Sequence, residues 1–122
     1  MDLSAPNILG KYFLDKDLSP LRALAHSKNL WKERMAMLAT LAFIRAGNYE
    51  LTKEFAALFM THKHDLMHKA AGWMLRETGK KNEKELIKFL NENYKKMPRT
   101  ALRYAIERLS PAKEMFYMKK NV

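Results

Sequence analysis

The segment DLMHKAAGWMLRETG, residues 65–79, holds the pattern with the clearest chemical meaning. Lys69, Trp73 and Arg76 fall at positions i, i+4 and i+7, which lie along one stripe of an α-helix. Two cations can meet phosphates while the indole between them stacks on a sugar or base, so the stripe favours nucleic-acid binding. Alternatively, Trp73 belongs to the core and the cations extend over it. Gly72 in mid-helix predicts that another element packs closely there, because glycine weakens a helix by about 1 kcal/mol relative to alanine.

The other polar residues predict no catalytic centre. His64 and His68 are four residues apart, as in zinc-binding HExxH helices, but Asp65 between them is expected to cap the helix and no third ligand is identifiable. Polar surface histidines, and no metal, are therefore favoured. Asp2 begins an expected helix, where capping is the usual role of aspartate. The remaining carboxylates alternate with lysines and are typical of solvated faces, as at Glu83, Glu85 and Glu92.

The composition and the positions of helix-capping and helix-breaking residues predict an all-α protein of one domain. Apolar residues make up 48% of the 122 and charged residues 30%, with only four glycines and four prolines. No segment alternates apolar and polar residues long enough to suggest a strand. Caps and breakers predict eight helices, at about 2–14, 19–26, 30–44, 49–60, 65–79, 82–94, 98–109 and from 111 onward.

The inner helices of this pattern repeat. Arg34, Lys69 and Arg103 align at separations of 35 and 34 residues, and so do three small residues expected at packing positions, Ala36, Ala71 and Ala105. Helix pairs of this length stack in α-solenoids and bury a continuous core. We therefore expect stacked helical hairpins, with approximate units 1–28, 29–62, 63–97 and 98–122. An ordinary helical bundle is the alternative.

The charge of the chain suggests an anionic partner. The absence of cysteine, of a membrane-spanning run and of a signal-peptide pattern suggests a cytoplasmic location. The net charge is +10, of which +2 falls in residues 1–61 and +8 in residues 62–122. Such an excess attracts polyanions, of which nucleic acid is the commonest. Cysteine is absent, no apolar run is long enough to span a bilayer, and the first ten residues lack the pattern of a signal peptide.

Four stretches in order resemble bacterial DNA alkylation-repair glycosylases built from HEAT-like repeats. They are DLSAPNILGKYF, NLWKERMAMLATLAFIR, KHDLMHKAAGWMLRETGK and MPRTALRYAIERL. The resemblance implies excision of alkylated purines from double-stranded DNA without a metal or a cofactor. It implies catalytic roles for Asp2, Arg34 and Trp73 and a DNA-facing position for Arg76. Arg103 is a plausible phosphate contact only.

The resemblance covers about the second half of such a protein. The tryptophan that precedes the catalytic aspartate by four residues in the family would lie before Met1. We therefore expect the isolated chain to have low activity, and either a separate first half or self-association through an exposed repeat face. A non-catalytic helical-repeat module that binds nucleic acid or an acidic protein is the alternative.

Overall fold

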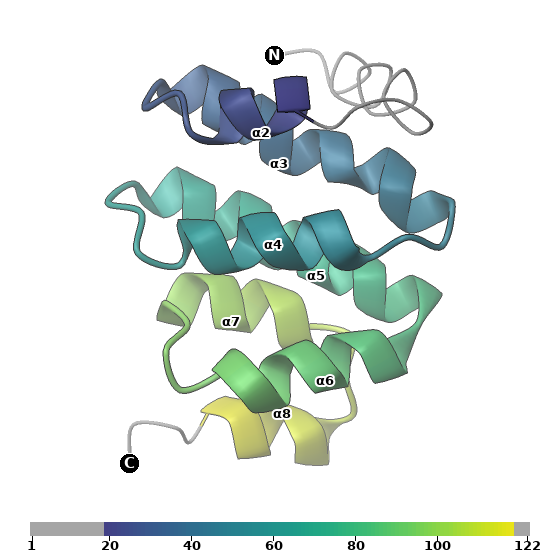
Figure 1. Cartoon of the computed structure of the whole chain (residues 1–122). Helices are drawn as coiled ribbons and strands as arrows, with labels where there is room; N and C mark the ends of the chain where they lie inside the picture. Colours follow the sequence, from purple (N-terminus) through teal and green to yellow (C-terminus); the bar gives the residue numbers. More distant parts are fainter. Residues whose placement is uncertain (1–18, 119–122) are drawn as a thin grey trace.

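The computed structural model describes residues 19–118, and these form seven α-helices and no strand. This confirms the all-α fold. The expected helix at 2–14, and with it Asp2, lies outside the described residues. The helices, in the labels of Figure 1, are α2 (Ser19–Ala25), α3 (Leu30–Arg45), α4 (Glu50–Phe59), α5 (Asp65–Lys81), α6 (Glu83–Asn93), α7 (Arg99–Ile106) and α8 (Pro111–Met118).

The helices alternate in direction and stack along the chain, as expected for a helical-repeat fold. Figure 1 shows α3, α5 and α7 running one way and α2, α4, α6 and α8 running the other. The connections that precede α3, α5 and α7 therefore meet at one edge of the stack, and the connections that follow them meet at the opposite edge. We call α3, α5 and α7 the inner helices and the other four the outer helices.

The start of α3 follows its capping residue, whereas both ends of α5 differ from the prediction. The Asn29 side chain accepts a hydrogen bond from the Lys32 amide at 3.1 Å and so caps α3 as expected. In α5, however, His64 is the capping residue and Asp65 is already helical. The prediction that Gly79 ends this helix is wrong as well, because α5 continues to Lys81. Gly79 instead lies against Leu86 of α6, where a side chain would clash.

The core runs continuously between the two layers. The three alanines aligned by the internal repeat are all buried, and so are Leu75 and Leu109. Gly72 shows why a glycine stands in the middle of α5: a Cβ atom there would lie 2.5 Å from the Ala101 carbonyl oxygen and 2.6 Å from the Tyr104 Cβ. The expected close approach is therefore confirmed, and the element that approaches is α7.

Candidate nucleic-acid interface

The three repeated cations of the inner helices differ in their surroundings. Lys69 and Arg103 are exposed, whereas Arg34 is only partly exposed. None of the three has a carboxylate within ion-pair distance among residues 19–118. Arg103 borders a surface pocket between α7 and α8 whose lining also includes Glu107 and Glu114, so the local potential there is mixed. Lys69, one turn after Asp65 in α5, and Arg103 are thus both accessible to an external anion.

The side chain of Arg34 contains a buried hydrogen-bond donor that is not satisfied. Its Nε is buried and has no hydrogen-bond partner among the described residues. Burying an N–H group without a partner costs about 1–3 kcal/mol of folding free energy. Arg34 as a whole is partly exposed and has no carboxylate within ion-pair distance in residues 19–118, so its guanidinium is suited to bind an anion that arrives from outside.

Trp73 and Arg76 share the stripe with Lys69, and both are partly buried. Trp73 packs against the hydrophobic core while keeping part of its surface accessible, so it combines features of the two interpretations of the sequence. Arg76 Nη1 donates a hydrogen bond to the Glu107 carboxylate of α7. Its Nε, like that of Arg34, is buried without a partner in the described chain. A phosphate at Arg76 would therefore compete with Glu107.

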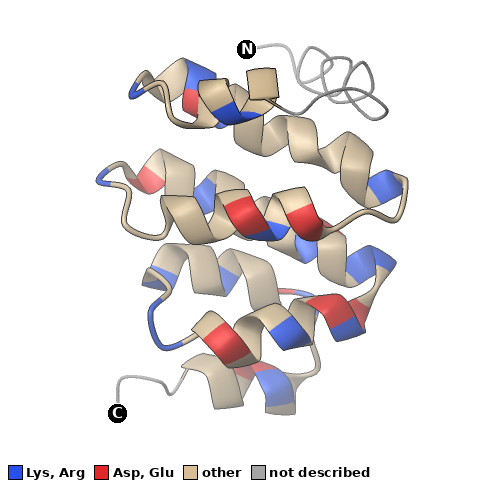
Figure 2. Cartoon of the chain, viewed as in Figure 1, with Lys and Arg blue, Asp and Glu red and all other residues tan. Residues whose placement is uncertain are grey.

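The outer helices contrast with the inner ones, because ion pairs link each outer helix to the next. Arg22 of α2 pairs with Glu54 of α4 at 2.9 Å, Lys53 of α4 pairs with Glu85 of α6, and Lys113 of α8 pairs with Glu83 of α6 at 3.4 Å. Hydrogen bonds from Arg22 and Lys53 lower the pKa values of Glu54 and Glu85. Figure 2 shows the acidic residues interleaved with basic ones along these helices. Cations of the outer layer are thus largely neutralised within the fold.

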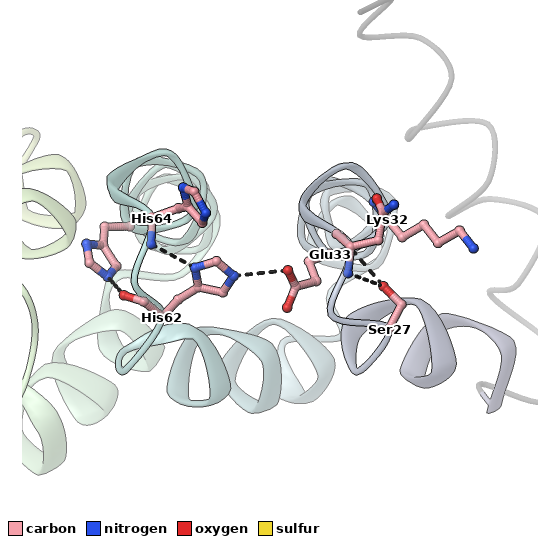
Figure 3. Close-up of polar contacts among 7 residues, drawn as sticks. Ser27, Lys32, Glu33, His62 and His64 are labelled. Carbon is pink, nitrogen blue, oxygen red and sulfur yellow. Dashed lines mark hydrogen bonds and ion pairs between the residues drawn. The ribbon is translucent and has the colours of Figure 1, made fainter.

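A histidine–glutamate pair joins α3 to the connection before α5, and sequence reasoning missed it. Glu33 is 9% exposed, and its Oε1 lies 3.0 Å from His62 Nε2. His62 Nδ1 accepts a hydrogen bond from the His64 amide, so Nε2 carries the proton and donates it to Glu33 (Figure 3). Both ring nitrogens are therefore engaged within the fold, and the pair holds two helices together rather than acting as a base. No sequence signal links two residues 29 positions apart.

His68, the second histidine of the HxxxH-like segment, is also engaged within the fold. His68 Nε2 lies 2.7 Å from the His62 carbonyl oxygen, and its Nδ1 lies 3.4 Å from an Asp65 carboxylate oxygen. A hydrogen bond from Thr100 is the main cause that lowers the pKa of Asp65. Within residues 19–118, no group of three His, Asp or Glu side chains is arranged to hold a metal ion.

Two exposed apolar residues lie on the inner helices, and no role is predicted for either from the sequence. Trp31 is 57% exposed and Leu66 is 41% exposed. Trp31 precedes Arg34 by one turn of α3, and Leu66 precedes Lys69 by one turn of α5, so each apolar side chain neighbours a cation on the same helix side. The signal that could have found them is this spacing, since an exposed indole beside a cation extends the pattern seen at Trp73.

The fold and this surface define an all-α helical-repeat protein whose inner helices carry several cations, among them Lys69 and Arg103, that have no ion pair within residues 19–118. The chain belongs to the DNA alkylation repair enzyme family, whose family model matches residues 1–109. DNA alkylation repair is accordingly the role of the chain, and DNA is the substrate of the family. No curated protein and no solved structure matches the chain in the same comparisons. Among the described residues, none of the helices has the length and apolar character needed to cross a membrane.

Proposed function

We propose that the chain binds double-stranded DNA containing alkylated purines along the exposed side of α3, α5 and α7, and acts in excision of the damaged base. The observation that carries the proposal is the separation of charges between the layers. The inner helices hold nine Lys or Arg against three Asp or Glu, whereas the outer helices hold five against six. Within residues 19–118, Arg34, Lys69 and Arg103 have no carboxylate within ion-pair distance. Free cations on one side of a stack bind polyphosphate by displacing its counterions.

The chemistry of excision needs few groups. An N-alkylated purine is cationic and leaves readily, so the sugar acquires positive, oxocarbenium-like character as the N-glycosidic bond breaks. A carboxylate beside the sugar stabilises that charge, and an indole face favours the cationic base. The family resemblance assigns the carboxylate to Asp2 and the indole to Trp73. Arg34 would bind the phosphate next to the reacting sugar, since it is partly exposed and has no carboxylate within ion-pair distance in residues 19–118.

The substitution Asp2→Asn tests the excision step. We expect the variant to keep its affinity for a duplex containing 7-methyladenine or 3-methyladenine but to release the base about 100-fold more slowly, the usual scale for losing one electrostatic group at the transition state. Base release would be followed by chromatography and DNA affinity by fluorescence anisotropy. If the wild-type chain binds the duplex but releases no base above the spontaneous rate, the chain is a non-catalytic binder and the excision proposal fails.

The substitution Lys69→Ala tests the binding face. Because each phosphate contact releases about one counterion, the slope of log affinity against log salt should become shallower by about one. Lys113→Ala is the matched control: this exposed lysine lies on an outer helix and is already paired with Glu83, so the slope should not change. The measurement is duplex affinity over a salt series. Equal slopes for the wild type and Lys69→Ala would exclude the inner helices as the phosphate-contacting side.

A further inference from the structure

The three connections that precede the inner helices share an unusual composition. Residues 26–29, 60–64 and 94–98 read HSKN, MTHKH and YKKMP, so each contains at least one lysine and none contains Asp or Glu. They lie at the same edge of the stack, since α3, α5 and α7 run in one direction (Figure 1). Figure 2 shows basic positions at each of these connections in turn, at the left of the view. We call Lys28, Lys63, Lys95 and Lys96 the lysine edge.

The lysine edge is not neutralised by its own protein. All four lysines are exposed, and none has a carboxylate within ion-pair distance in the described part of the chain. Asp65, two residues after Lys63, interacts with His68. Glu92, three residues before Lys95, is exposed and lies beyond ion-pair distance of the four lysines.

Ordered turns hold these lysines in place. Lys28 has a φ of 64°, the left-handed conformation, and the turn around it is closed by a hydrogen bond from the Asn29 amide to the Ser27 hydroxyl at 3.2 Å. Lys63 lies between His62 and His64, whose ring–amide hydrogen bond of 3.0 Å fixes the turn. Lys95 Nζ lies 6.0 Å from the centre of the Tyr94 ring. Positioned charges lose less conformational entropy on binding than free ones.

The spacing of the connections suits a nucleic-acid backbone. Packed helices lie about 8–10 Å apart, so successive connections are separated by about three nucleotides of rise along one strand of B-DNA. A row of three positive turns, about 16–20 Å long in all, can contact several phosphates of a duplex, whereas a compact anion would meet only one turn.

We propose that the lysine edge binds the phosphate backbone of duplex DNA and so sets which strand runs along the ends of the inner helices. The inference deepens the proposed function and rests on it, because it adds a second line of phosphate contacts beside the face that carries Arg34 and Lys69.

The test compares the DNA binding of a variant that loses three positive charges at the lysine edge with that of a variant that loses three at the opposite edge of the stack. The triple variant Lys28→Ala, Lys63→Ala, Lys95→Ala should bind an undamaged 20-base-pair duplex about tenfold more weakly in 50 mM salt, with a salt slope shallower by about two to three. The control variant Arg45→Ala, Lys81→Ala, Arg108→Ala loses the same net charge. Its three residues are exposed and lie where the inner helices end, so the slope should change by less than about one.

The outcomes separate this inference from the function on which it rests. If the two triple variants weaken binding equally, only net charge matters and the lysine edge is not a site. If the double variant Lys69→Ala, Arg103→Ala weakens binding but the lysine-edge variant does not, the edge proposal fails and the inner-face proposal stands. If neither weakens binding, both fail. Thermal unfolding of each variant verifies that the compared proteins are folded.

Discussion

Replacing Arg34 with methionine should make the protein more stable and less able to repair DNA. Methionine fills a similar volume without the buried, unpartnered Nε, so the free energy of unfolding should rise by about 1 kcal/mol and the melting temperature by about 4 °C. In the same variant we expect base release to fall about 100-fold, because the proposed contact of Arg34 with the phosphate next to the reacting sugar would be lost. Stability would be measured by thermal unfolding and activity by single-turnover base release.

The control for this prediction is Lys32→Met, on the same helix. Lys32 is exposed, and its side chain extends away from the Glu33–His62 pair in Figure 3. The free energy of unfolding should therefore change by no more than about 0.5 kcal/mol, and the rate of base release by no more than about twofold. An Arg34→Met protein that is less stable than the wild type would mean that the guanidinium already contributes to folding. That result would remove the physical argument for an external anion at Arg34.

Substituting Gly72 with alanine should separate α5 from α7. The new Cβ would lie 2.5 Å from a backbone oxygen and 2.6 Å from the Tyr104 Cβ, and neither atom can move without moving α7. Overpacking of this kind lowers the free energy of unfolding by about 1–3 kcal/mol or more. The better helix propensity of alanine offsets about 1 kcal/mol of this loss. We expect a net loss of about 2 kcal/mol and a melting temperature about 8 °C lower. DNA affinity should fall as well, because α7 carries Arg103.

The matched control is Gly79→Ala in the same helix. The alanine there would meet the end of the Leu86 side chain, which can adopt another rotamer, so the loss should stay within about 1 kcal/mol. Calorimetry of the two variants would provide the comparison. Equal stability of Gly72→Ala and the wild type would show that α5 and α7 are farther apart in solution than the packing at Gly72 requires.

Sequence patterns predicted the elements of the fold because these depend on local chemistry. Apolar periodicity and caps such as Asn29 fixed seven helices to within a few residues, and the repeat of small residues identified positions that are buried in the stack. The end of α5 was missed because Gly79 was taken as a terminator. Its actual role is to admit Leu86 from the next helix, which local sequence does not reveal.

The sequence by itself determined the family, the helical class and a recurring cation on the inner helices. Only the tertiary structure decided which cations are free. Arg76 and Glu107, or Glu33 and His62, are about one repeat apart in the chain, and their pairing depends on how neighbouring helices cross. Helical periodicity defines the face of a residue but not its partner on another helix. For that reason, packing alone decides that Arg34 and Lys69 have no ion pair within residues 19–118. Packing alone also brings three lysine-containing turns to one edge.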